Sequence, residues 1–91
     1  MESIEVGQLV CSKAGRDIGQ YFLVFEIINE SFILVVDGKV RKVENPKKKN
    51  IKHLRFLPKV AEKAAKRLNG GTPPSNSEVR KAIQNLVISQ D

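Results

Sequence analysis

The stretch GQLVCSKAGRDIGQYFLVFEIINESFILVVDG, residues 7–38, decides the expected fold. It contains three short runs rich in Val, Ile, Leu and Phe, separated by turn-forming residues: GQLVCS, QYFLVFEII and SFILVV. Asn29-Glu30 separates the second run from the third, and Asp37-Gly38 is a dipeptide favoured in two-residue type I′ hairpins. The stretch therefore predicts three consecutive antiparallel strands, with a tight hairpin leading to a fourth.

Two further runs have the composition of strands, namely KVRKV at residues 39–43 and IKHLRFL at residues 51–57. Five short strands with close connections cannot bury two faces as an open sheet. We therefore expect a mainly β protein whose strands form a small, strongly bent barrel.

The apolar period changes from two residues to near 3.6 at Pro58, which suits the first position of a helix. Asn69-Gly70-Gly71 is expected to end that helix, and Ser75 with Glu78 indicates a capping box before a second helix at residues 77–88. The sequence predicts a barrel at residues 1–57 and a two-helix extension at residues 58–91, packed on the barrel or projecting from it.

The chain has 91 residues, a formal net charge of +6 and one cysteine. Cys11 lies in an apolar run and is expected to be buried, and a lone cysteine excludes an intrachain disulfide. The acidic start MESIEVGQ is not a secretory signal, and no apolar run reaches the roughly 20 residues that span a bilayer. We expect one cytoplasmic domain without membrane contact.

Positive charge is concentrated in residues 39–55, which hold eight Lys and Arg against one Glu. On a strand, Lys39 and Arg41 would share one face and Val40 the other, while the three lysines after Asn45-Pro46 would lie on a loop. Lys13 and Arg16 lie on the loop SKAGRDIG between the first two strands, where a turn with positive φ at glycine is expected. Such segregated charge favours a polyanionic partner over a merely solvated surface.

Enzymatic chemistry requires a convergent set of acids, bases and nucleophiles, which this sequence does not supply. His53 is the one histidine and is flanked by cations, so it is predicted to face solvent or phosphate. GRDIG matches neither the dinucleotide fingerprint nor the lysine-bearing phosphate loop. We expect no enzyme activity, no cofactor and no metal site.

Aromatic residues total 5%, and most lie in alternating apolar runs where core packing is expected. Tyr21, beside the GRDIG turn, is the one that could face a base. Few aromatics and many cations favour recognition of the backbone and shape of structured RNA.

The segment VGQLVCSKAGRDIGQYFLVFEI resembles a KOW motif, the strand, glycine-containing loop and strand of SH3-like barrels in ribosomal and transcription-elongation proteins. The continuation FILVVDGKVRKVENPKKKNIKHL is similar to the basic half of such barrels in large-subunit ribosomal proteins, most closely the archaeal and eukaryotic family numbered fourteen, and in small bacterial KOW RNA-binding proteins. Many KOW motifs carry a glycine three positions after the one matched by Gly19, where this chain has Phe22.

The resemblance implies a five-stranded SH3-like barrel of the KOW type and non-enzymatic binding of structured RNA, most directly ribosomal RNA of the large subunit. Protein neighbours are expected at the C-terminal helices. The predicted RNA contacts are Lys13, Arg16, Lys39, Arg41, Lys42, Lys47, Lys48, Lys49, Lys52, His53 and Arg55. The alternative is a protein-interaction module that recognises an acidic partner. A ribosome component, an assembly factor and a regulator all remain open at this stage.

Overall fold

The computed structural model describes residues 3–88. The first three predicted strands are confirmed: β1 (Gln8–Ser12), β2 (Tyr21–Ile27) and β3 (Phe32–Val36). Each pairs antiparallel with the next, so that Leu9 lies opposite Leu23 and Leu23 opposite Val36. Phe22, at the position where many KOW motifs have glycine, is 1% exposed, so its ring fills the core.

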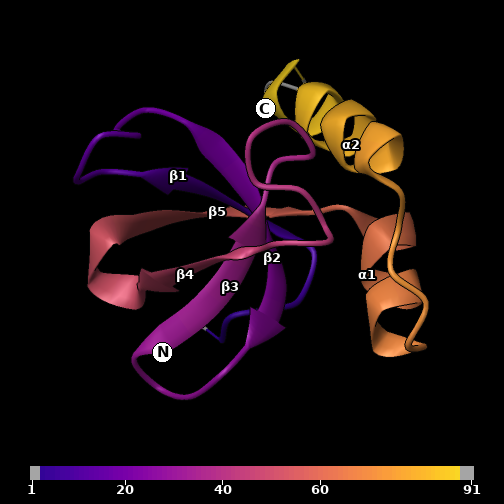
Figure 1. The fold of residues 1–91 in the computed structure, drawn as a ribbon, viewed down its shortest axis with the longest axis horizontal. Helices are drawn as coiled ribbons and strands as arrows, with labels where there is room; N and C mark the ends of the chain where they lie inside the picture. The colour runs from indigo at the N-terminus through magenta and orange to yellow at the C-terminus, as the bar shows by residue number, and fades with distance from the viewer. Residues whose placement is uncertain (1–2, 89–91) are drawn as a thin grey trace.

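All five strands belong to one antiparallel sheet in the order β4-β3-β2-β1-β5. The last strand, β5 (Leu54–Val60), returns to pair with β1 and places Phe56 opposite Val10. Figure 1 shows the strongly bent sheet with both helices on one side of it. The expected mainly β, SH3-like barrel with two C-terminal helices is confirmed.

The predicted fourth strand is wrong. KVRKV lies in the connection between β3 and β4, and the strand is instead β4 (Lys47–Asn50), which pairs with β3 and places Lys47 opposite Val35. The two-residue hairpin at Asp37-Gly38 is also wrong, because Asp37 Oδ1 accepts the backbone N–H groups of Lys39 and Arg41 at 2.9 and 2.8 Å. These bonds fold the chain into a longer loop, residues 37–46, called the β3–β4 loop below.

The start of the first helix is also later than predicted. Pro58 lies within β5, and α1 (Glu62–Asn69) begins four residues after it. A proline fits there because β5 is an edge strand and its register with β1 shifts between Gln8 and Val10, opposite the proline. The 3-10 turn η1 (Ile51–His53) replaces the predicted start of this strand.

The second helix, α2 (Asn76–Ile88), has the predicted capping box. The Ser75 N–H donates to Glu78 Oε1 at 2.8 Å, and the Glu78 N–H donates to Ser75 Oγ at 3.1 Å. Glu78 has its pKa lowered, first by the backbone hydrogen bond from Ser75 and also by the charge of Arg67. The cap therefore fixes the residue at which α2 begins.

Both helices pack on the barrel, because Ala61, Ala64 and Val79 share a buried cluster with Leu9 and Leu23. A second cluster lies within the barrel and includes Val10, Phe22, Val24, Ile33, Val35 and Leu54. Cys11 is buried, as predicted. The division at residues 57 and 58 stays a prediction, and β5 runs three residues past it.

Candidate nucleic-acid interface

The loop between β1 and β2, residues 13–20, presents Lys13 and Arg16 to solvent. Gly15 and Gly19 both have φ of 88°, so the predicted positive-φ turn is confirmed. The Lys13 N–H donates to the carbonyl oxygen of His53 at 2.9 Å, which joins this β1–β2 loop to η1. Cations from two distant parts of the sequence are thereby brought together.

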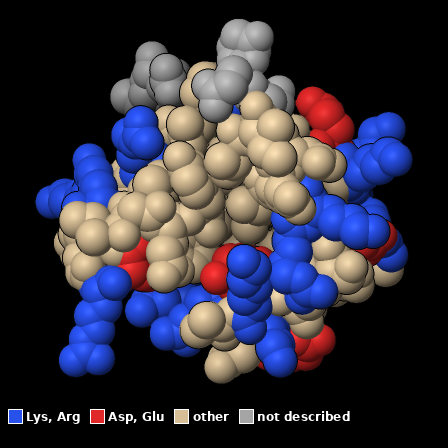
Figure 2. All heavy atoms as spheres, turned by 90° about the horizontal axis from the view of Figure 1, so that it is seen from above, with Lys and Arg blue, Asp and Glu red and all other residues tan. Residues whose placement is uncertain are grey.

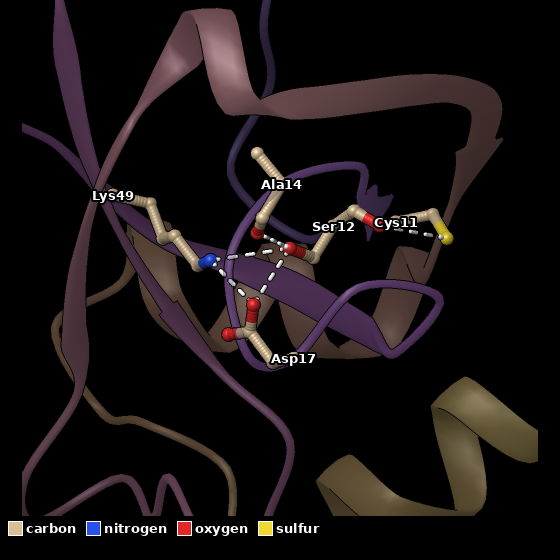
Figure 3. A network of polar contacts seen from close by, with 5 residues as sticks. All are labelled: Cys11, Ser12, Ala14, Asp17 and Lys49. Atoms are coloured by element: carbon tan, nitrogen blue, oxygen red, sulfur yellow. Dashed lines mark hydrogen bonds and ion pairs between the residues drawn. The ribbon is translucent and has the colours of Figure 1, made fainter.

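A buried ion pair inside the barrel fixes the β1–β2 loop (Figure 3). Lys49 Nζ donates to Asp17 Oδ1 at 2.8 Å, and their side chains are 8% and 17% exposed. Ser12 Oγ donates to the same Asp17 oxygen at 2.7 Å and accepts from Lys49 Nζ at 3.2 Å. The three side chains come from the end of β1, the loop itself and β4, so they cross-link three segments of the barrel.

The carboxyl group of Asp17 has a pKa below its ordinary value of 3.8. Burial alone raises that pKa, but the hydrogen bonds from Lys49 and Ser12 and the lysine's charge together outweigh it. Asp17 is therefore an anion at neutral pH, and its charge balances that of Lys49.

The prediction that Lys49 lies on an exposed loop is wrong, since the residue is 7% exposed and belongs to β4. Alternate residues of a strand face opposite sides, so Lys49 points into the barrel while Lys48 lies on the other face. Lys48 Nζ sits 4.6 Å from the centroid of the Phe32 ring, a cation–π contact. Sequence reasoning missed the role of Asp17, although an aspartate within a basic turn was a usable signal.

The β3–β4 loop is held by α2. Arg80 Nη1 donates to the Gly38 carbonyl oxygen at 2.7 Å. Asn76 Oδ1 accepts the Val43 N–H at 2.8 Å, and Asn76 Nδ2 donates to Glu44 Oε1 at 2.9 Å. The hydrogen bond from Asn76 is the main cause that lowers the pKa of Glu44. In Figure 1 this loop lies beside α2 at the top of the molecule.

Ten of the eleven predicted contact residues reach the surface. Arg41 and Lys47 are half-buried, and the exposed ones are Lys13, Arg16, Lys39, Lys42, Lys48, Lys52, His53 and Arg55. Among residues 3–88, Lys49 is the one member of the predicted set with a carboxylate at ion-pair distance. Figure 2 shows Lys and Arg side chains around much of the rim of the face it views.

Two further observations concern metal binding and membrane-spanning helices. No group of three or more His, Cys, Asp or Glu among residues 3–88 is placed to hold a metal ion. Neither described helix is long and apolar enough to cross a membrane.

Fold and charge together define a class: a small basic protein with an SH3-like barrel of the KOW type, extended by two helices. No protein-family model matches the chain. Among curated proteins, large ribosomal subunit protein eL14 of Staphylothermus marinus is 30% identical over 90 residues, which cover 99% of this chain and 86% of that protein. The chain therefore belongs to the eL14 family of large ribosomal subunit proteins.

Two further relatives carry the same name. The eL14 protein of Hyperthermus butylicus is 31% identical over 84 residues, covering 92% of this chain and 79% of that protein. The eL14 protein of Desulfurococcus amylolyticus is 35% identical over 83 residues, covering 91% of this chain and 79% of that protein. Membership of a family of ribosomal proteins confirms the resemblance drawn from sequence and the prediction that the chain is not an enzyme.

Proposed function

We propose that this protein binds structured RNA as part of the large ribosomal subunit in the cytoplasm, with ribosomal RNA as its direct partner. The observation that carries the proposal is a surface of ten cationic or histidine side chains that have no carboxylate at ion-pair distance within residues 3–88, on a chain related to eL14 proteins. Phosphates of an RNA backbone supply anionic partners for these side chains. When Lys and Arg neutralise the phosphates, the counterions of the RNA are released.

The contact surface consists of the β1–β2 loop, the β3–β4 loop, the outer face of β4, and η1 with the start of β5. Both loops are anchored, one by Lys49 and the other by α2, so their cations are held in place before RNA arrives. Pre-ordering reduces the entropy lost on binding. Lys49 is left out of the surface because its ammonium group is enclosed and paired with Asp17.

Recognition on this surface is directed at backbone and shape. Phosphate contacts fix position and orientation, and double-stranded RNA is recognised mainly by its shape and by its phosphates and 2′-hydroxyl groups. α1 and α2 each turn an apolar face to the barrel and leave a polar face, with Lys63 and Lys81, exposed to solvent. Protein neighbours in the subunit would meet the outer faces of these helices.

Co-sedimentation with ribosomal subunits of the same organism tests the proposal. A variant with Lys39→Glu, Lys42→Glu and Lys52→Glu is compared with one carrying Lys63→Glu, Lys66→Glu and Lys81→Glu, which makes the same charge change on the exposed faces of the helices. We expect the first variant to leave the large subunit and the second to stay. Equal retention of the two variants would contradict the proposed surface, and retention after the RNA is digested would favour an acidic protein partner.

A further inference from the structure

A cleft of about 650 Å³ lies where the start of β2, the β3–β4 loop and α2 meet. Tyr21 and Gln20 form one wall, Lys39 and Val40 a second, and α2 contributes the third with Arg80 and Gln84 among its residues. Figure 2 looks down on this end of the molecule, where uncharged residues occupy the middle of the face and Lys and Arg side chains stand around it.

The walls combine an aromatic ring with amides and apolar side chains. Tyr21 is half-buried, and Val40 is 77% exposed although it is a large apolar residue. Each glutamine carries both a hydrogen-bond donor and an acceptor, as the edges of RNA bases do. Unpaired bases are recognised in proteins by stacking on aromatic rings combined with hydrogen bonds to their edges.

The charges at the rim suit a nucleotide. Lys39 is exposed and has no carboxylate at ion-pair distance among residues 3–88, and Arg80 has five N–H donors, one of which donates to the Gly38 carbonyl oxygen. Asp37 also lines the cleft, but its Oδ1 already accepts two backbone N–H groups. The rim therefore attracts the phosphates on either side of an inserted base.

The groove between the two helices lacks this combination of features. It lies between α1 and α2, has a volume of about 440 Å³ and is lined by Ala61, Ala64, Pro74, Leu86 and charged residues, without an aromatic ring. A third hollow of about 440 Å³, at the end of β2, has an aromatic ring, Phe25, but its lining includes Glu26 and no Lys or Arg. Of these three hollows, the cleft beside Tyr21 alone combines an aromatic ring with cations.

We propose that the cleft beside Tyr21 holds one unpaired base of the bound RNA, stacked on the tyrosine ring and contacted by Gln20 and Gln84, with Lys39 and Arg80 on the adjacent phosphates. The inference rests on the proposed RNA-binding function and deepens it. It makes the protein selective for a bulged or looped nucleotide within an otherwise shape-recognised RNA.

The fluorescence of the protein reports on Tyr21 directly, because the chain has one tyrosine and no tryptophan. The probes are two RNA hairpins that are identical except that one has a single bulged nucleotide. We expect the bulged hairpin to bind at least about fivefold more tightly, which corresponds to the usual free energy of stacking one base on an aromatic ring. We also expect it to quench Tyr21 fluorescence more strongly at saturation. Equal affinity and equal quenching for the two hairpins would overturn the proposal.

Two pairs of variants locate the effect. Tyr21→Phe keeps the ring and should keep the preference for the bulge, whereas Tyr21→Leu should remove it. Because Tyr21 also packs against the core, Gln84→Glu is compared with Asn85→Glu, which adds the same charge one residue along α2 in the other groove. We expect Gln84→Glu to lose the preference and Asn85→Glu to retain it; the reverse, or no difference, would overturn the assignment.

The same hairpins separate this proposal from the proposed function. If the variant with glutamate at positions 39, 42 and 52 binds both hairpins as tightly as the unaltered protein, the RNA-binding surface itself is wrong. If that variant loses affinity but the unaltered protein shows no preference for the bulge, the RNA-binding surface is supported and the proposed base site is wrong.

Discussion

The two basic loops of this protein are fixed in contrasting ways. The β1–β2 loop is fixed from inside the barrel, by a lysine and an aspartate whose side chains are 8% and 17% exposed. The β3–β4 loop is fixed from outside the barrel, by the Asn76 side chain of α2, which accepts the Val43 N–H, and by Arg80, which donates to the Gly38 carbonyl oxygen. One anchor is thus part of the folded core, and the other belongs to an element that follows the barrel in the chain.

The contrast assigns a role to the C-terminal helices. Loss of the internal anchor leaves a charge in the barrel without a partner, so the barrel itself becomes unstable. Loss of the external anchor frees a surface loop and leaves the strands paired. We infer that α2 serves to position the cations of the β3–β4 loop, and the following variants test this difference.

The largest effect is expected for Asp17→Ala. Removal of one partner of a buried pair leaves the other charge uncompensated, which costs about 4 kcal/mol of the free energy of unfolding. Arg67→Ala breaks the exposed pair between Arg67 and Glu78, whose side chains are 43% and 50% exposed, and should cost much less because solvent screens such a pair. Urea unfolding of both variants measures the difference; similar losses would contradict the role of the Lys49–Asp17 pair.

Gly38→Ala should have the next largest effect, roughly 3 kcal/mol from a strained backbone and an overpacked contact. Gly38 has φ of 77°, and a Cβ there would lie 2.4 Å from the backbone oxygen of Asn76. Gly19→Ala is the control, because φ is 88° and nothing lies within 4 Å of the added carbon. The control should lose only about 1 kcal/mol; equal losses on urea unfolding would show that the loop does not press against α2.

Asn76→Ala removes both bonds from this side chain to the β3–β4 loop and should cost about 1 kcal/mol. Amide hydrogen exchange is the sharper readout, because the Val43 N–H loses its acceptor and should exchange faster. Asn76→Asp retains an acceptor for Val43 and should retain its protection. Unchanged exchange at Val43 in Asn76→Ala would argue against the anchor.

The Lys49–Asp17 ion pair also makes stability depend on pH. The pKa of Asp17 is lower in the folded protein than in the unfolded chain, so its contribution is complete above the ordinary value of 3.8 and is lost as the pH falls through the folded pKa. Asp17→Asn should therefore flatten the fall in stability below about pH 4. Thermal unfolding over this pH range measures the change in stability. If the stability of Asp17→Asn falls as steeply as that of the unaltered protein, the acid sensitivity belongs to other carboxyl groups.

The strands that could be predicted are those whose apolar residues alternate or cluster strongly enough to decide the structure locally, as in β1, β2 and β3. The capping box at Ser75 and the helix end at Asn69 followed from local hydrogen-bond chemistry in the same way. These features depend on neighbours in the sequence.

The errors fall where distant residues decide the structure. KVRKV has the composition of a strand, but α2 holds it in a loop through contacts with Asn76 that join residues more than thirty positions apart. Lys49 is recognisable as a buried residue only when Asp17 is known to lie opposite it. Pro58 is tolerated in β5 because that strand is at an edge, which depends on the order of the whole sheet.

The salt dependence of binding to large-subunit ribosomal RNA tests the central claim most directly. If anchored cations contact phosphates, the logarithm of the binding constant falls linearly with the logarithm of the salt concentration, and each of Lys39→Gln, Lys42→Gln and Lys52→Gln lowers the slope by about 1. Lys63→Gln, on the exposed face of α1, should leave the slope unchanged. A slope that is the same in all four variants would contradict RNA binding by these loops.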